Sequence, residues 1–197
     1  MPRGFPNWDD VYKNEDPEKM PWFSRELDSD LDETIKKMNI NSGSFLDLGT
    51  GPGSQAIRLS EKGFEVTGSD ISEHAIEKAK KLESKINFVV DDILDTKLPK
   101  ESYDYIFDRG CFHVLEPEQR EKYIENVLSI LKTGGILFLK LFSKREPEIQ
   151  GPQKFDPDEI KIMFEKYFEI ESIEEIEYQS DTLTEKPKAL FCILKKK

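Results

Sequence analysis

The chain has 197 residues, which is enough for one domain with a sizeable hydrophobic core. Hydrophobic residues make up 37% and charged residues 35%, a balance typical of a globular and very soluble protein. The formal net charge of -11 repels a phosphate backbone, so nucleic acid is not expected as a partner.

The two cysteines, Cys111 and Cys192, have no metal-ligand spacing, so no metal site is predicted. The N-terminus lacks the apolar core of a signal peptide. The strongest apolar run, 136–142, is interrupted by Lys140 and is too short to cross a bilayer. We therefore expect a cytoplasmic protein with reduced thiols and no membrane partner.

In chain order, an aromatic segment at 5–23 comes first and has no strand partner, so we place it as a cap over the carboxyl edge of a sheet. A helix is expected at 30–38. Strand and helix patterns then alternate: strands at 44–48, 64–69, 86–90, 103–107 and 136–141, and helices at 55–62, 73–82 and 117–131. Gly63 is expected to end the helix at 55–62, and Gly134-Gly135 the helix at 117–131.

Nearly continuous apolar strands separated by helices indicate a parallel sheet covered on both faces, which is a doubly wound α/β fold. After a last helix at 156–166, two β segments at 167–176 and 188–194 are expected to pair as an antiparallel hairpin at one end of the sheet. We divide the chain into residues 1–40, the aromatic cap and its helix, and residues 41–197, the ligand-binding part of a single domain.

A glycine-rich loop follows the first predicted strand, in the sequence LDLGTGPGS at 46–54. Its three glycines let the backbone turn sharply and approach a ligand closely. The helix that begins near Ser54 would point free amides at that ligand, outside the carboxyl ends of the strands where open α/β sheets bind. A tight structural turn would account for the same glycines.

Acidic residues follow the next two predicted strands. Asp70 lies where a carboxylate accepts both hydroxyls of a ribose, and Asp91 and Asp92 lie where an acid receives an adenine amino group. Each of them alone would also fit a helix cap or a turn. Together they favour a nucleoside site at the edge of the sheet.

Two details of the loop distinguish between cofactors. A nicotinamide site has the spacing G-x-G-x-x-G, whereas this loop has G-x-G-x-G. Asp47, just before the glycines, would oppose a pyrophosphate but suits a ligand with an ammonium and a sulfonium cation. S-Adenosylmethionine is therefore the expected cofactor.

These motifs resemble those of class I S-adenosylmethionine-dependent methyltransferases over nearly the whole chain. The resemblance implies a Rossmann-like, seven-stranded sheet in the order 3-2-1-4-5-7-6 with the seventh strand antiparallel. It implies that the glycines line the methionine part, Asp70 holds the ribose, and Ile71, Asp92 and Ile93 surround the adenine. The predicted cofactor-binding residues are Trp22, Asp47, Gly49, Thr50, Gly51, Gly53, Asp70, Ile71, Asp91, Asp92, Ile93 and Asp108.

The loop after the fourth strand, 108–113, should face the transferred methyl group. With Trp8-Asp9 and Pro21-Trp22 it resembles the subset of thiopurine, thiol, halide and tellurite methyltransferases. The candidate acceptor-binding residues are Trp8, Tyr12, Arg109 and His113.

Each acceptor candidate has a structural alternative. The aromatic side chains form either a lid over the cofactor or simple packing on the core. Arg109 either holds an anionic acceptor or pairs with Asp108 or Glu116. His113 is either a base or a packed side chain, and His74 is expected to be solvated, away from the site.

No catalytic residue is assigned, because none is a compelling base. We therefore expect methyl transfer to a small-molecule acceptor, a thiol or other soft nucleophile, since an amine would need a base to remove its proton. Three other hypotheses stay open: methylation of a protein lysine or other amine, a regulatory module that binds S-adenosylmethionine without turnover, and a nicotinamide oxidoreductase, which the loop spacing disfavours.

Overall fold

A computed structural model describes residues 7–147 and 151–197. The strands are β1 (Ser44–Leu48), β2 (Glu65–Asp70), β3 (Asn87–Val90), β4 (Tyr103–Asp108), β5 (Leu131–Ser143), β6 (Lys154–Phe155), β7 (Phe168–Glu177) and β8 (Lys188–Lys196). The α-helices are α1 (Trp8–Asn14), α2 (Ser29–Lys37), α3 (Ser54–Glu61), α4 (Glu73–Leu82), α5 (Arg120–Ile130) and α6 (Pro157–Phe164). Short 3-10 turns are η1 (Pro17–Lys19), η2 (Ile93–Asp95), η3 (Phe112–Val114) and η4 (Pro117–Gln119).

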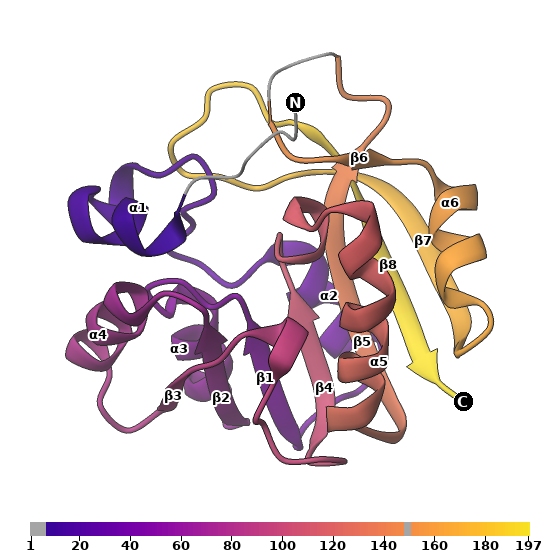
Figure 1. Cartoon of the computed structure of the whole chain (residues 1–197), viewed down its shortest axis with the longest axis horizontal. Coiled ribbons are helices and arrows are strands. Elements are labelled where there is room, and N and C mark those ends of the chain that lie inside the picture. Colours follow the sequence, from indigo (N-terminus) through magenta and orange to yellow (C-terminus); the bar gives the residue numbers. More distant parts are fainter. Residues whose placement is uncertain (1–6, 148–150) are drawn as a thin grey trace.

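One sheet runs through the molecule in the order β3-β2-β1-β4-β5-β8-β7, with the two-residue β6 beside β5 (Figure 1). The strands from β3 to β5 are parallel, and β8 is antiparallel to both of its neighbours. Because β6 is an additional short strand, β7 and β8 are the predicted sixth and seventh strands. The predicted fold class and strand order are confirmed.

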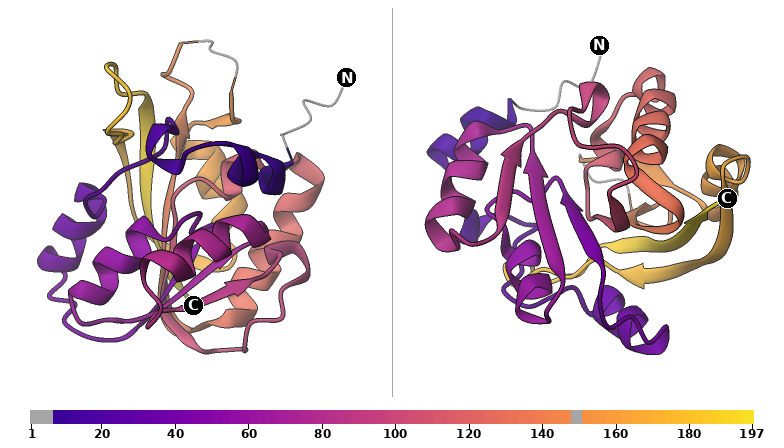
Figure 2. Two further views of the ribbon diagram at one scale, coloured as in Figure 1. Left: turned by 90° about the vertical axis from the view of Figure 1, so that its left-hand side faces the viewer. Right: turned by 90° about the horizontal axis from the view of Figure 1, so that it is seen from below.

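Helices cover both faces of the sheet, as Figure 2 shows. Adjacent residues of β1 point to opposite faces: Phe45 packs in the layer with α2, α3 and α4, and Leu46 in the layer with α5 and α6. Both side chains are 0% exposed. Burying a side chain of this size stabilises the fold by about 1.5–3 kcal/mol. The alternation of side chains along β1 therefore determines which face of the strand packs against each layer of helices.

The start of β5 differs from the prediction. Gly134 and Gly135 were expected to separate a helix from a strand, but α5 ends at Ile130 and both glycines lie inside β5. A Cβ on Gly135 would lie 2.9 Å from the carbonyl oxygen of Asp104, so the residue allows a close approach of β5 to β4 where their register shifts. The glycine pair permits strand pairing there rather than ending an element.

The N-terminal segment contributes to two different parts of the molecule. Tyr12 and Met20 form a small separate cluster with Ala75 of α4, and α1 lies beside α4 in Figure 1. Leu31 and Ile35 of α2 instead belong to the main core on one face of the sheet. Within residues 7–147 and 151–197, no helix combines the length and apolar character needed to cross a membrane.

Candidate functional site

The bend between β1 and α3 depends on glycine. Gly49, Gly51 and Gly53 have φ values of 72°, 55° and 86°, in the left-handed region that L side chains rarely adopt. The amides of Gly49 and Thr50 both donate to the carbonyl oxygen of Ser69 at the end of β2, at 2.8 and 2.9 Å. The bend is therefore held directly against the carboxyl end of the neighbouring strand.

Asp47, in β1 just before the bend, accepts hydrogen bonds from residues of the bend and of α3. Its side chain is only 3% exposed, and one carboxylate oxygen accepts from the Thr50 hydroxyl at 2.5 Å and from the Ala56 amide at 3.0 Å. Burial raises the pKa of Asp47 to about 6, although these two hydrogen bonds oppose the shift. The Asp47 carboxyl therefore changes its protonation state close to neutral pH.

Asp70 joins the bend to the start of α4. Its two carboxylate oxygens accept from the Gly51 amide and from the Ser72 amide, each at 2.9 Å. Burial raises the pKa of this carboxyl, while the backbone donors lower it. The structure brings together the glycine bend, Asp47 and Asp70, which the sequence placed at one sheet edge.

The residues predicted near an adenine have different surroundings. Ile71 is 54% exposed beside Asp70, whereas Ile93 is 5% exposed in the main core. Asp92 caps η2 by accepting from the Leu94 amide at 2.9 Å. Asp91 accepts from the Lys97 amide at 2.7 Å, and its other carboxylate oxygen is buried without a hydrogen-bond partner in the described residues.

Asp108, at the end of β4, is 0% exposed and organises the turn that follows. Its carboxylate accepts from three successive amides, of residues 110–112, at 2.9, 2.7 and 3.0 Å, and from the Tyr123 hydroxyl at 2.6 Å. Burial raises its pKa against these donors. All of these donors belong to the protein itself, and contact with a cofactor stays a prediction.

Cys111 lies where these strand ends converge. A Cβ on Gly49 would lie 3.3 Å from the Cβ of Cys111. Burial raises the pKa of the Cys111 thiol well above its usual value, and the charges of Asp108, Asp70 and Asp92 raise it further. The thiol is therefore protonated near neutral pH and is a poor nucleophile.

The aromatic cap touches the bend directly. A Cβ on Gly51 would lie 2.7 Å from the Tyr12 hydroxyl oxygen, and Tyr12 is only 6% exposed. Burial, with the nearby charge of Asp70, raises the pKa of Tyr12 above its usual value. Trp8 and Trp22 meet edge to face beside it, with ring centroids 5.8 Å apart. The structure thus places Tyr12 against the predicted cofactor loop, and Trp8 and Trp22 pack against the same small cluster as Tyr12.

Helix α1 is fixed to α4 through Asp9. One Asp9 oxygen accepts from the Ser72 hydroxyl at 2.9 Å and from the His74 amide at 3.0 Å, and the other lies 2.8 Å from His74 Nδ1. These contacts, led by the His74 amide, lower the pKa of Asp9 to about 2. The expected solvation of His74 is partial: its side chain is 35% exposed, and its contacts with Asp9 help to hold the cap against α4.

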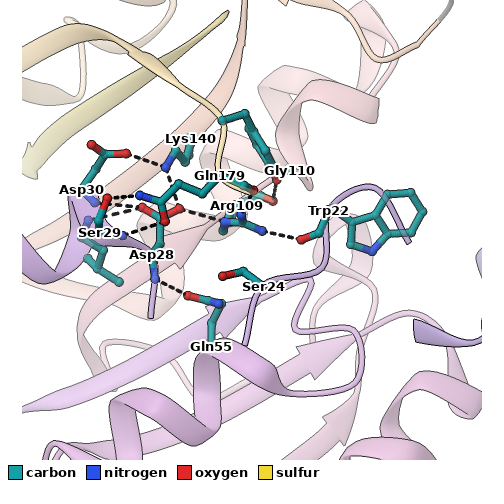
Figure 3. A network of polar contacts seen from close by, with 12 residues as sticks. Trp22, Ser24, Asp28, Ser29, Asp30, Gln55, Arg109, Gly110, Lys140 and Gln179 are labelled. Carbon is teal, nitrogen blue, oxygen red and sulfur yellow. Dashed lines mark hydrogen bonds and ion pairs between the residues drawn. The ribbon is translucent and has the colours of Figure 1, made fainter. Parts of the chain in front are cut away.

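Arg109 is paired with neither of its expected partners, Asp108 and Glu116. Its Nε donates to Asp28 at 2.9 Å, and its two terminal nitrogens donate to the carbonyl oxygens of Trp22 and Gln179 (Figure 3). The ion pair expected of Arg109 exists, but its acid comes from the segment before α2.

His113 is buried, at 5% exposure, and stacks on Phe142 with ring centroids 5.0 Å apart. Burial, reinforced by the charge of Arg109, lowers its pKa to about 3, so the imidazole is neutral near pH 7. Its Nδ1 has no hydrogen-bond partner among the described residues, and a Cβ on Gly110 would lie 3.1 Å from its Nε2.

The sequence interpretation missed four residues around Arg109: Asp28, Lys140, Tyr178 and Gln179. Lys140 carried a signal, because a lysine inside an apolar strand must find a buried partner. Its Nζ is 2.6 Å from carboxylate oxygens of Asp28 and Asp30. Tyr178 and Gln179 follow β7 and gave no local signal.

Two surface hollows lie away from the glycine bend. One, of about 680 Å³, is lined by residues such as Ser44, Thr67, Asn87 and Tyr103 along one face of the sheet. The other, of about 250 Å³, lies between α2 and the β7–β8 hairpin. Among the described residues, no group of three or more His, Cys, Asp or Glu side chains is arranged to hold a metal ion.

Comparison with known proteins gives consistent matches. A model of the methyltransferase domain matches residues 45–135. A 2-heptyl-1-hydroxyquinolin-4(1H)-one methyltransferase of Mycobacteroides abscessus is 26% identical over 173 residues, covering 82% of this chain and 76% of the relative. A thiocyanate methyltransferase of Brassica oleracea is 27% identical, covering 85% and 77%.

An uncharacterised methyltransferase of Schizosaccharomyces pombe is 34% identical over 105 residues, which cover 51% of this chain and 72% of the relative. Among solved structures, one described as "Conversion of a Disulfide Bond into a Thioacetal Group during Echinomycin Biosynthesis" has a TM-score of 0.82 at 23% identity, covering 96% of this chain and 91% of that one. With the strand order and the glycine bend, these matches show that the chain belongs to the class I S-adenosylmethionine-dependent methyltransferases.

Proposed function

We propose that this protein transfers the methyl group of S-adenosylmethionine to a small molecule, with a thiol or another soft nucleophile as the acceptor. The observation that carries the proposal is the convergence at Gly51. Its amide donates to Asp70 at 2.9 Å, and the space above its Cα is bounded by the Tyr12 hydroxyl. A glycine bend, a carboxylate and an aromatic cap meet at this one residue.

The residues around the bend fit a cationic nucleoside ligand. Asp47, Asp70 and Asp92 supply carboxylates for the ammonium group and the ribose and adenine donors, and exposed Ile71 supplies an apolar surface for a ring. Aromatic side chains such as Tyr12 and Trp22 attract a sulfonium and exclude water. When bound, S-adenosylmethionine supplies an electrophilic methyl group.

The acceptor side offers no strong base. His113 is neutral, with a pKa of about 3, and the Cys111 thiol is held in its protonated form. An acceptor that ionises easily by itself, such as a thiol, needs no such base, whereas an ammonium acceptor would.

The chemistry required of the protein is then orientation. Holding the acceptor and the methyl group in line, with water excluded, lowers the activation free energy by roughly 7–11 kcal/mol. The names of the relatives support a small-molecule acceptor, since one acts on thiocyanate and another on a hydroxyquinolone, and the match to the thiocyanate enzyme favours a soft nucleophile.

A panel assay with methyl-labelled cofactor tests the proposal. The acceptors are hydrosulfide, thiophenol, thiocyanate, 2-heptyl-1-hydroxyquinolin-4(1H)-one and a lysine peptide. We expect labelled product from a thiol, and much less from the Asp70→Ala variant when the cofactor concentration is below saturation. Transfer only to protein in a cell extract would overturn the small-molecule claim. Cofactor binding with no labelled product from the panel or the extract would favour the sensing module.

A further inference from the structure

Asp28 connects four elements of the fold through buried contacts. It caps α2, because one carboxylate oxygen accepts from amides of the first turn of that helix. Its own amide donates to the Gln55 side chain of α3 at 2.8 Å. The second carboxylate oxygen accepts from Arg109 after β4 at 2.9 Å and from Lys140 in β5 at 2.6 Å (Figure 3).

The charges in this network balance one another. Lys140 and Asp28 are 0% exposed, the Arg109 side chain is 8% exposed, and Asp30 completes the set by accepting from Lys140 at 2.6 Å. Burial alone would raise the pKa of Asp28, but Lys140 and Arg109 outweigh it and hold that pKa below its usual value. The two cations are therefore neutralised within the protein, and neither is free to bind an anionic acceptor.

Arg109 extends the network to two connecting segments. Its planar guanidinium donates to the carbonyl oxygens of Trp22 at 2.8 Å and of Gln179 at 2.5 Å. The Tyr178 hydroxyl donates to the Arg109 carbonyl oxygen at 2.6 Å, and the guanidinium carbon lies 4.6 Å from the centre of the Tyr178 ring. The end of the cap and the β7–β8 connection thus meet at one side chain.

These two segments also bind each other. The Asp181 amide donates to the Phe23 carbonyl oxygen at 2.9 Å, and the Thr182 hydroxyl donates to that of Met20 at 3.0 Å. The Arg25 amide donates to the Asp181 carboxylate at 2.8 Å. The end of the cap and the β7–β8 connection therefore lie side by side. Arg109 hydrogen-bonds to the backbone of each segment and connects them to the end of β4.

We propose that Asp28, Arg109 and Lys140 are positioning residues that hold the Trp22 end of the cap over the glycine bend. Trp22 packs on Trp8, and Tyr12 of the same cap touches Gly51, so a displaced Trp22 backbone would loosen the cover over the cofactor. The network therefore controls how long the cofactor product stays bound. This consequence rests on the proposed function, whereas the attachment of Trp22 does not.

Tryptophan fluorescence tests both parts. In a Trp8→Phe background, Trp22 is the only tryptophan, because the sequence contains two. Arg109→Met keeps much of the side-chain length and leaves Lys140 to pair with Asp28. We expect stronger acrylamide quenching of Trp22 and a roughly tenfold faster release of S-adenosylhomocysteine in stopped-flow measurements, because loss of contacts over a ligand acts mainly on its dissociation rate.

Arg58→Met, in the same background, is the matched control. Arg58 also donates to a backbone carbonyl of the cap segment, that of Arg25 at 2.7 Å, but it pairs with Glu61 on the surface and lies outside the network. We expect this variant to behave like the parent protein in both measurements.

The outcomes separate the hypotheses. If Arg109→Met melts cooperatively and both readouts match the parent, the network is only structural and the proposal is wrong. If Arg109→Met does not melt cooperatively, Arg109→Lys decides by the same readouts, because it keeps the buried charge but cannot reach both carbonyl oxygens. If the parent itself does not bind S-adenosylhomocysteine, the proposed function fails, and quenching alone decides the positioning claim.

Discussion

The Asp70 carboxylate accepts a 2.9 Å hydrogen bond from the Gly51 amide, which links the end of β2 to the middle of the glycine bend. The other oxygen of the same carboxylate accepts from the Ser72 amide, before α4. One acid therefore sets the spacing between the bend and the adjacent helix, and a change at this residue should alter ligand binding before it alters the core.

Asp70→Ala should weaken the binding of S-adenosylhomocysteine by about 1.5–3 kcal/mol, the range for hydrogen bonds to a charged group. Isothermal titration calorimetry measures the loss. Asp10→Ala is the control, because Asp10 is an exposed acid in α1 whose side chain has no ion pair among the described residues. Unchanged affinity in a folded Asp70→Ala protein would show that Asp70 is not a cofactor ligand.

Gly51→Ala should disturb the cap as well as the bend. The new Cβ would lie 2.7 Å from the Tyr12 hydroxyl oxygen, and φ at this residue is 55°, which costs an L side chain about 1–2 kcal/mol. Gly63→Ala is matched for strain, since φ there is 92°, but its Cβ would meet no atom within 4 Å. We expect both to lower the melting temperature.

Only Gly51→Ala should also reduce cofactor affinity, and Tyr12→Phe in the same protein should recover part of that loss by removing the clashing oxygen. A Gly51→Ala protein that binds S-adenosylhomocysteine like the parent would count against a ligand at this bend.

Asp47 should make cofactor affinity depend on pH. Burial raises its pKa to about 6, so its carboxylate ionises as the pH rises through that value. A cationic ligand favours the ionised form, so affinity for S-adenosylmethionine should rise between about pH 5 and about pH 7, by at most about tenfold per pH unit.

Asp47→Asn keeps an oxygen to accept from the Ala56 amide but has no charge to gain, so its affinity should lack this rise. Calorimetric titrations over the pH range compare the two proteins. A parallel pH dependence in both would assign the effect to another group.

His113 should make the free energy of unfolding depend on pH, with the protein less stable in acid. Its pKa falls from 6.5 to about 3 on folding, so the unfolded chain binds more protons between these values. Stability from this residue is complete above about pH 6.5 and is lost as the pH falls towards about 3.

His113→Phe keeps a ring to stack on Phe142 and cannot be protonated, so its denaturation midpoint should fall less in acid than that of the parent. Urea unfolding at a series of pH values measures the difference. Equal acid sensitivity would mean that the imidazole is solvated rather than buried.

The sequence contained most of the information about the sheet and the bend. Apolar alternation, helix caps and glycines are local features, and they predicted the succession of strands and helices along the chain and the loop at 49–53. The order of the strands within the sheet came from the resemblance to the family. The two-residue β6 and the early start of β5 were missed, because both depend on pairing with a neighbouring strand rather than on the residues themselves.

Only the folded chain decided how the charged and aromatic side chains combine. Asp28 is separated from Arg109 by 81 residues and from Lys140 by 112, and nothing in the spacing of the sequence pairs them. A buried charge must find an opposite partner, but which one it meets depends on how β4, β5 and the start of α2 pack together. The sequence alone determined the family-like bend and its acids, whereas tertiary packing assigned Arg109 to the protein's own network and placed Tyr12 on Gly51.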